Sequence, residues 1–268
     1  MTVKLYDTTL RDGAQQEGIS LSVDDKLNIT RRLDDLGMHY IEGGIPGSNP
    51  KDIEYFKRVR NLSLSNSLIS AFGLTRRANA DVESDEGIRL LLAAETPVVT
   101  LVGKSHSGQV ISVLETTLEE NLAMLADSIS YLKSKGRSVF FDAEHFFDGF
   151  KSNKEYAMRS LRVALEAGVD SIALCDTNGG MLPTDINDIV RAVRQETSSD
   201  IGIHCHNDAD MAVANSIAAI QAGVDHVQGT INGYGERCGN ANLISIIANL
   251  KLKMGIDCIS SNQMSSLT

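Results

Sequence analysis

The sequence predicts a single (β/α)8 barrel, and three observations lead to this fold class. Eight short apolar runs alternate with eight longer amphipathic segments along the 268 residues. Strict alternation of this kind favours a parallel sheet with right-handed crossovers. Three of the helix ends also share one pattern, which indicates a repeated helix-to-strand unit. Eight units in a chain of this length suit a closed barrel better than an open, doubly wound sheet.

The predicted strands are the short apolar runs. They cover Val3–Tyr6, Tyr40–Glu42, Leu68–Phe72, Val98–Val102, Val139–Ala143, Ser171–Cys175, Ile201–His204 and His226–Thr230. Each is followed by a predicted helix, in the order Val23–Leu36, Pro50–Arg60, Ser84–Glu95, Thr117–Lys135, Lys154–Ala167, Thr184–Glu196, Met211–Ala222 and Ala241–Lys253.

Local signals support the predicted helix ends. Ser22 precedes the first helix and Asp25 follows three residues later, an acidic variant of the capping box. Gly37, Gly168 and Gly223 each close a helix and are each followed by a hydrophobic residue, then Asp or His, then a strand. Glycine adopts the left-handed cap conformation without a Cβ penalty, so this repeated closure fits the repeated unit.

Domain boundaries follow from the same pattern. No low-complexity segment or linker divides the chain, and we expect one barrel over residues 1–258. Residues 259–268 are polar and weakly helical. They are predicted to be the start of a further, truncated C-terminal element.

Composition excludes several classes of function. The formal net charge is −10 and there is no basic run, which argues against nucleic acid or an anionic membrane as a partner. No apolar stretch is long enough to span a bilayer, and no secretory signal follows Met1. The four cysteines are scattered without a CxxC pair, which is typical of reduced thiols in the cytoplasm.

Polar side chains collect after the predicted strands, at the end where barrels of this class carry their functional residues. They are Asp7, Arg11, Asp12 and Gln15 after the first strand, Glu42 after the second, Asp142, Glu144 and His145 at the fifth, Asp176–Gly180 at the sixth, His204–Asp208 at the seventh and Asn232–Asn240 after the eighth.

Two histidines and a carboxylate in this set predict a metal site. His204 and His206 share one face of their strand because successive side chains alternate, and a closed barrel would bring Asp12 to the same rim. Two imidazole nitrogens with one or two oxygens suit Zn²⁺, Mn²⁺ or a similar ion. The alternatives are that the histidines are hydrogen-bonded core residues and that Asp12 caps a helix or a turn.

Three further polar residues are candidate catalytic groups. Arg11 could form a surface salt bridge, but beside a metal carboxylate it would balance a developing oxyanion. Glu144 and Thr177 stand singly at strand ends. Hydrogen bonding behind the site and direct contact with a substrate are equally open for both of them.

The glycine-rich segment Gly229–Gly239 has two interpretations. Its backbone N–H groups could cradle a phosphate, which makes Asn232, Gly233 and Gly235 the candidate cofactor-binding residues. It could equally be a strained turn that presents one side chain.

Three motifs together resemble a known family. Leu10-Arg11-Asp12-Gly13-Ala14-Gln15, followed after ten residues by Lys26, is similar to the N-terminal signature of the isopropylmalate/homocitrate/citramalate synthases, which belong to the DRE-TIM metallolyases. His204-Cys205-His206-Asn207-Asp208 resembles the second signature, and Gly235-Glu236-Arg237-Cys238-Gly239-Asn240 resembles the synthase form of the last active-site loop. Segments Tyr40–Gly44, Pro46–Pro50, Asp142–Gly149 and Leu174–Gly180 resemble the citramalate branch.

The resemblance implies a ligand set and a reaction. Asp12, His204, His206 and Asn240 would hold a divalent metal (Mn²⁺, Mg²⁺, Zn²⁺ or Co²⁺), and Arg11, Glu144 and Thr177 would surround a 2-oxo acid. The implied reaction is a Claisen-type condensation of acetyl-CoA with pyruvate, followed by thioester hydrolysis to citramalate and CoA, in isoleucine biosynthesis. The resemblance also implies a cytoplasmic homodimer, with a further subdomain that supplies a His and a Tyr to the site and a regulatory domain, neither of which these 268 residues contain.

Other functions stay open from the sequence. A related synthase would use ketoisovalerate or 2-oxoglutarate, and a lyase would run the reverse cleavage. A catalytically idle barrel would serve as a binding or dimerisation module. A phosphate-binding isomerase would use the Gly229–Gly239 segment.

Overall fold

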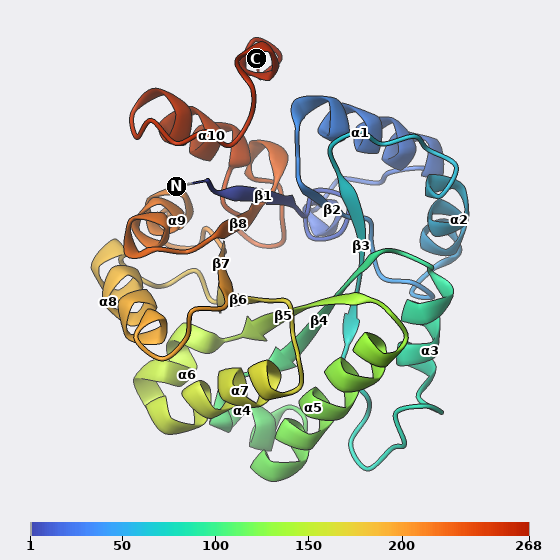
Figure 1. The fold of residues 1–268 in the computed structure, drawn as a ribbon, viewed down its shortest axis with the longest axis vertical. Helices are drawn as coiled ribbons and strands as arrows, with labels where there is room; N and C mark the ends of the chain where they lie inside the picture. Colours follow the sequence, from blue (N-terminus) through green and yellow to red (C-terminus); the bar gives the residue numbers. More distant parts are fainter. Residues whose placement is uncertain (1, 268) are drawn as a thin grey trace.

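The computed structural model describes residues 2–267 and confirms the predicted fold class. Eight parallel strands close into one barrel in sequence order, with β8 paired to β1. Figure 1 shows the ring of strands and the helices around it. The strands are β1 (Lys4–Asp7), β2 (Tyr40–Glu42), β3 (Leu68–Leu74), β4 (Val98–Lys104), β5 (Ser138–Glu144), β6 (Ser171–Asp176), β7 (Asp200–Cys205) and β8 (His226–Gly229).

The helices form the outer layer. They are α1 (Val23–Leu36), α2 (Pro50–Val59), α3 (Glu86–Ala93), α4 (Ser107–Ser112), α5 (Leu118–Ser134), α6 (Phe146–Ser152), α7 (Lys154–Glu166), α8 (Pro183–Arg194), α9 (Ala212–Ala222), α10 (Leu243–Leu252) and α11 (Ser261–Met264), with 3₁₀ turns η1 (Gly13–Gln15) and η2 (Ile231–Gly233).

All eight predicted strands and all eight predicted helices are present, with ends that differ by a few residues. The larger differences lie between strand and helix. β3 and β4 continue two residues further, to Leu74 and Lys104, and α4 and α6 were not predicted. The short helix α11 lies in residues 259–268, which the sequence marked only as weakly helical. These three helices have six, seven and four residues, which is too short for a helical repeat of apolar positions to show in the sequence.

The predicted helix ends are confirmed. Ser22 and Asp25 form a reciprocal capping box at the start of α1. Gly37, Gly168 and Gly223 have left-handed backbones, with φ of 90°, 88° and 106°. Each of these glycines turns the chain from a helix into the next strand, and the repeated closure therefore reflects a repeated structural unit.

The barrel interior is filled with side chains. The rings of Tyr6 and Phe140 lie 6.0 Å apart, and the ring of His226 lies 5.8 Å from Phe140. Gly202 makes room for this layer, because a Cβ there would lie 2.0 Å from His226 Nε2. Next to the rings, on the side of the Tyr6 hydroxyl, the core becomes polar. There the hydroxyl donates to the buried carboxylate of Glu42 at 2.7 Å. This polar layer is the floor of the site described below.

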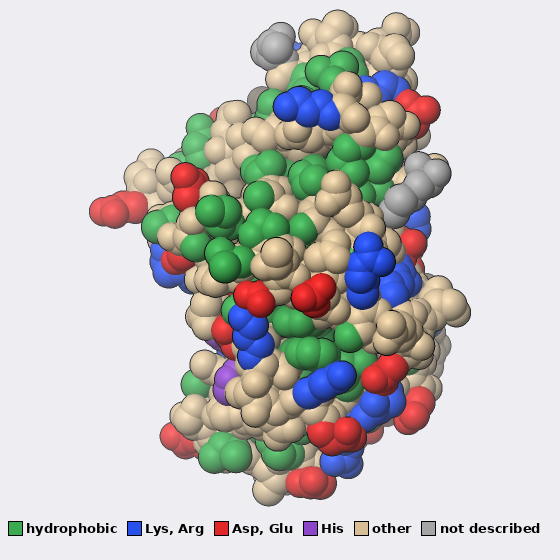
Figure 2. All heavy atoms as spheres, turned by 90° about the vertical axis from the view of Figure 1, so that its left-hand side faces the viewer, with side chains coloured by type: hydrophobic (Ala, Val, Ile, Leu, Met, Phe, Trp, Pro, Cys, Tyr) green, Lys and Arg blue, Asp and Glu red, His purple; other side chains and the backbone are tan. Residues whose placement is uncertain are grey.

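The outer surface carries mixed charge. On the face that holds α8, α9 and α10, acidic and basic side chains are interspersed with apolar ones and form no continuous basic area among the described atoms (Figure 2). Within residues 2–267 no helix has the length and apolar character needed to cross a bilayer.

Candidate active site

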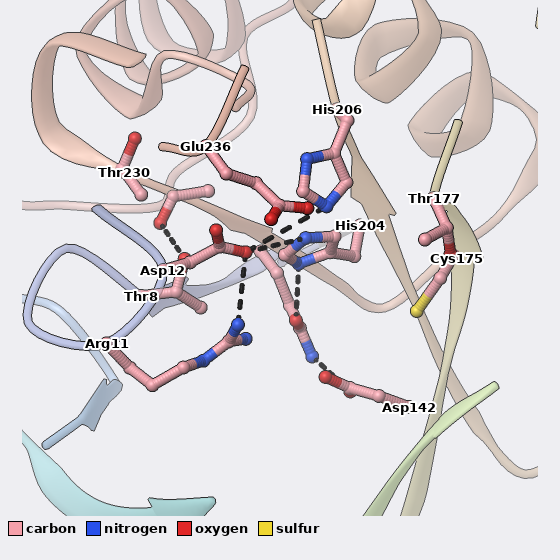
Figure 3. Close-up of polar contacts among 12 residues, drawn as sticks. Thr8, Arg11, Asp12, Asp142, Cys175, Thr177, His204, His206, Thr230 and Glu236 are labelled. Carbon is pink, nitrogen blue, oxygen red and sulfur yellow. Dashed lines mark hydrogen bonds and ion pairs between the residues drawn. The ribbon is translucent and has the colours of Figure 1, made fainter. Parts of the chain in front are cut away.

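Asp12, His204 and His206 meet at one end of the barrel. Nε2 of His204 lies 3.4 Å from Asp12 Oδ2, and Nε2 of His206 lies 3.9 Å from the same oxygen (Figure 3). One ligand atom from each of the three side chains lies within 4.8 Å of the others, and all three residues are buried. The predicted convergence of a carboxylate and two imidazoles is present in the structure, and the group could hold a metal ion.

Backbone contacts fix the position of this group. The N–H groups of Arg11, Asp12 and Gly13 all donate to the carbonyl of Thr8, at 2.9–3.1 Å, which folds the segment after β1 into a tight turn. His206 pairs with Asn240 in an isolated antiparallel bridge. Main-chain hydrogen bonds therefore fix the backbone of Asp12 near the start of the chain and the backbone of His206 and Asn240 near its end.

The charged groups of the site shift one another's pKa values. Burial would raise the pKa of Asp12, but Arg11 and the two imidazoles outweigh it and hold that pKa well below its usual range. Burial lowers the pKa of His204, but its contact with Asp12 reverses the direction and raises it. Burial and the neighbouring His204 lower the pKa of His206 to about 3. Asp12 is therefore ionised at neutral pH, and the His206 imidazole is neutral.

Unpartnered polar atoms show that a divalent cation fits here. Among the described residues, Oδ1 of Asp12, Nδ1 of His206 and both amide atoms of Asn240 are buried without a hydrogen-bond partner. Leaving such atoms unpaired costs free energy, and a bound ion would satisfy the oxygens. Asn240 adds an oxygen donor next to His206. Nitrogen and oxygen donors in this mixture suit Zn²⁺, Mn²⁺ and similar ions.

Arg11 is held inside the site. Its Nε donates to Glu42 Oε1 at 2.6 Å, and its Nη1 lies 3.2 Å from Asp12 Oδ2. The guanidinium also lies 4.0 Å above the ring of Phe72, and the side chain is only 11% exposed. The surface salt bridge considered from the sequence is therefore wrong, because Arg11 is buried beside Asp12, the candidate metal-binding carboxylate.

Glu42 is a functional neighbour to which the sequence assigned no role. It is fully buried and accepts hydrogen bonds from both Arg11 and Tyr6. The only indication in the sequence was that Glu42 is a carboxylate at the end of an apolar strand. Its pairing with Arg11 could not be read from spacing, because it depends on β2 lying next to β1.

Glu144 and Thr177 lie at the strand ends that the sequence predicted, but each has a protein partner. Glu144 forms an ion pair with Lys104 at 2.6 Å, and the two residues are aligned in the β4–β5 register. Thr177 Oγ1 accepts the His145 N–H at 2.8 Å. No hydrogen bond or ion pair joins either side chain to the three metal-binding candidates among the described residues. Lys104 was missed because it lies beyond the predicted end of its strand.

The segment Gly229–Gly239 forms a constrained turn. The N–H of Gly233 donates to Thr230 O at 3.3 Å, and that of Gly235 donates to the Gln16 side chain at 3.4 Å. A Cβ at Gly235 would lie 2.3 Å from Asn240 Nδ2. These contacts favour the turn that presents one side chain, Asn240. Cofactor binding by Asn232, Gly233 and Gly235 stays a prediction.

Arg237 connects three loops over the site, although the sequence assigned it no role beyond its place in the last motif. Its guanidinium donates to both carboxylate oxygens of Asp208, at 2.8 and 2.9 Å. It also donates to the backbone carbonyl of Thr177 at 2.8 Å. The loops after β6, β7 and β8 are thereby tied together, which no local sequence pattern indicates.

Asp7 does not belong to the site, although it was grouped with the rim residues. By strand alternation it shares the face of Leu5, turned away from the barrel interior. Its carboxyl oxygens accept the Thr9 N–H at 2.9 Å and the Thr9 hydroxyl at 2.8 Å.

A cavity of about 680 Å³ opens beside Arg11. It lies between the segments that follow β1 and β2. Its lining is mainly apolar and includes Leu10, Ile19 and Ile45, with Lys26 and Lys51 as basic members. The cavity therefore offers space for an extended, largely apolar group next to Arg11.

Comparisons with known proteins identify the family of this chain. Residues 2–266 match the model of the HMGL-like family. The chain is 52% identical over 265 residues to an (R)-citramalate synthase of Geobacter sulfurreducens, covering 99% of this chain and 50% of that protein. It is 36% identical to a 2-isopropylmalate synthase of Sulfolobus acidocaldarius, covering 95% of this chain and 64% of that protein.

Solved structures share the fold at low sequence identity. An HMG-CoA lyase of Bacillus subtilis superposes with a TM-score of 0.83 at 19% identity, covering 99% of this chain and 91% of the other. The chain spans about half the length of the curated citramalate synthases that it matches.

Proposed function

This chain belongs to the HMGL-like family, and we propose that within it the protein condenses acetyl-CoA with pyruvate and hydrolyses the thioester, giving (R)-citramalate and CoA. In this reaction a methyl proton leaves acetyl-CoA, a carbon–carbon bond forms to the carbonyl carbon of pyruvate, and water releases CoA. The observation that carries the proposal is the convergence of Asp12, His204 and His206 beside Arg11.

Asp12, His204, His206 and Asn240 are the residues that would hold a divalent cation. Such an ion supplies Lewis acidity toward a carbonyl oxygen when it is bound. The chain's own contribution is the set of donors on a rigid turn and strand, together with the dry surroundings that burial provides.

Arg11 is the proposed partner of the reacting oxygens. Glu42 and Phe72 restrain its guanidinium from two directions. A fixed cation at this point stabilises negative charge that develops on the bound oxo acid. Because the restraint exists before substrate binds, little reorganisation is needed during the reaction.

Glu144 and Thr177 are proposed to line the oxo-acid pocket. The Lys104 ammonium lies 2.6 Å from the Glu144 carboxyl group and restrains it at the end of β5. In this position Glu144 would orient a substrate or a water, or assist proton transfer. The Thr177 hydroxyl accepts the His145 N–H at 2.8 Å and keeps its own proton available for donation.

The cavity beside Arg11 is the proposed position of the acyl-CoA arm. Its apolar lining suits a pantetheine chain, and Lys51 offers a positive charge for the phosphates. The Asn232–Gly235 turn is a second candidate contact for the cofactor. We also propose a cytoplasmic homodimer that acts in isoleucine biosynthesis, with residues 1–258 as its catalytic barrel.

We propose pyruvate as the substrate rather than a larger oxo acid. The reason is that this chain is 52% identical to a citramalate synthase but 36% identical to a 2-isopropylmalate synthase. Isothermal titration of pyruvate into the purified protein, with and without Mn²⁺, tests the site. We expect binding only with the metal, and none for Asp12→Asn. Pyruvate binding that is the same without metal, or unaffected by Asp12→Asn, would reject the site.

A thiol-release assay with acetyl-CoA then tests the reaction. Pyruvate, ketoisovalerate and 2-oxoglutarate are compared as co-substrates. We expect CoA release to be fastest with pyruvate. Faster release with either larger acid would assign the chain to a related synthase, and metal-dependent pyruvate binding without CoA release would favour a binding module.

A further inference from the structure

Gln228 is a buried amide that lies behind the candidate metal group. It belongs to β8, is 0% exposed, and stands opposite His204 of β7 in the strand register. We propose that Gln228 is a positioning residue that fixes the His204 imidazole in the tautomer whose Nε2 can bind a cation. This inference rests on the metal site of the proposed function.

Both ends of the Gln228 amide are engaged. Its carbonyl oxygen lies 2.9 Å from His204 Nδ1, and its amide nitrogen donates to Asp142 Oδ1 at 2.8 Å. Figure 3 shows dashed contacts that lead from His204 down to Asp142. The three side chains come from β7, β8 and β5, so the chain of contacts crosses the barrel interior.

The polarity of these contacts determines the tautomer. An amide nitrogen only donates hydrogen bonds, and an amide oxygen only accepts them. Because the Asp142 carboxyl takes the amide nitrogen, the amide oxygen faces His204 and requires a proton on Nδ1. A neutral imidazole protonated at Nδ1 carries its lone pair on Nε2. That nitrogen is the one that lies 3.4 Å from Asp12 Oδ2.

His206 provides an internal contrast. Its Nδ1 is buried without a hydrogen-bond partner among the described residues, so no side chain specifies its tautomer. The two histidines share the same strand end and the same carboxylate. Only His204 has its second nitrogen engaged by the described part of the chain, and we therefore assign to it the role of the pre-oriented ligand.

An amide suits this position better than a carboxylate would. A charged group against Nδ1 would add a second anion next to Asp12 in a fully buried place, where unpaired charge is costly. Gln228 instead meets Nδ1 with a neutral amide oxygen, and its amide nitrogen is held by Asp142 on the far side. Outer partners of this kind typically change metal affinity about 10- to 100-fold when they are lost.

The experiment combines a spectroscopic and a binding measurement. Long-range ¹H–¹⁵N NMR of the metal-free protein at pH 8.5 reports which nitrogen of each histidine carries the proton. Calorimetric titration with Mn²⁺ and Zn²⁺ alone gives the affinities. One variant is Gln228→Met, which keeps a similar volume without hydrogen bonds. The other is the double variant Gln228→Glu with Asp142→Asn, in which the new carboxylate would accept from His204 and the new amide would donate to that carboxylate.

We expect wild-type His204 to be protonated at Nδ1. Gln228→Met should mix the tautomers of His204, leave His206 unchanged, and weaken both metals about 10- to 100-fold. The double variant should recover affinity to within about threefold of wild type, which loss of packing would not explain. Wild-type His204 without a proton on Nδ1 would overturn the inference, even if the variants fail to fold. Unchanged metal affinity in Gln228→Met would overturn the role of Gln228 and leave the proposed metal site standing. A wild-type protein that binds neither metal would overturn the proposed metal site as well.

Discussion

Asp7 gives the sharpest test of the electrostatics described above. The side chain is completely buried, and burial, the largest effect, raises its pKa from 3.8 to about 7. The two hydrogen bonds from Thr9 act in the opposite direction, and the charge of Glu42 adds to the rise. We predict that Asp7→Asn stabilises the protein at pH 8 and does so progressively less as the pH falls.

The magnitude follows from the difference between the folded and unfolded states. The folded pKa is higher than the unfolded one by about three pH units, each equivalent to about 1.4 kcal/mol. Below pH 3.8 both states are protonated and Asp7 costs nothing. As the pH rises toward 7, the unfolded state ionises first and stability falls by about 4 kcal/mol, then stays level above pH 7.

Asparagine removes this cost while it keeps the local contacts. Its amide oxygen accepts the Thr9 N–H, and its amide nitrogen donates to the Thr9 hydroxyl. The measurement is urea unfolding of the metal-free protein, followed by circular dichroism between about pH 4 and about pH 8.5. The stability gain of Asp7→Asn over wild type should grow from near zero to about 4 kcal/mol across this range.

Asp34 provides a control of opposite sign. Burial would raise the pKa of Asp34, but backbone N–H groups of Ser65, Asn66 and Ser67 outweigh it and hold that pKa below its usual range. The stability that Asp34 contributes is present above its unfolded pKa and is lost as the pH falls, so Asp34→Asn should destabilise most at neutral pH. An Asp7→Asn effect that is constant with pH, or that destabilises at pH 8, would refute the reasoning.

Three further predictions follow from the site and the fold. Asp12→Asn removes the charge shared by both imidazoles and should lower Zn²⁺ affinity by about 100-fold or more, checked by calorimetry. Arg11→Lys keeps the charge but loses the Nε contact to Glu42, so kcat/KM for pyruvate should fall about 100-fold with metal content unchanged in elemental analysis. Gly149→Ala would place a Cβ 2.5 Å from the backbone oxygen of Ser105 and should cost about 1–3 kcal/mol, visible as a lower Tm.

The sequence was sufficient for the barrel because its signals are local. A capping box at Ser22 and glycines at positions 37, 168 and 223 depend on neighbours a few residues away, and the structure has all of them. The short helices α4 and α6 were missed for the same reason, since their few residues contain no repeat.

Part of the site was also accessible from the sequence. The spacing of His204 and His206 places both on one face of a strand, and the barrel topology brings the turn after β1 to the same end. Asp12 therefore joined the two imidazoles in the prediction, and the structure places its carboxylate 3.4 Å from the nearer imidazole nitrogen.

Only the tertiary structure decided how these groups are held. Glu42 supports Arg11, Lys104 pairs with Glu144, and Gln228 lies between His204 and Asp142 because strands far apart in the chain align in a particular register. A shift of one residue in any strand would turn its side chains to the opposite face. The chain thus specifies by itself which chemistry is available, whereas the register of the closed barrel determines which charges and hydrogen bonds that chemistry meets.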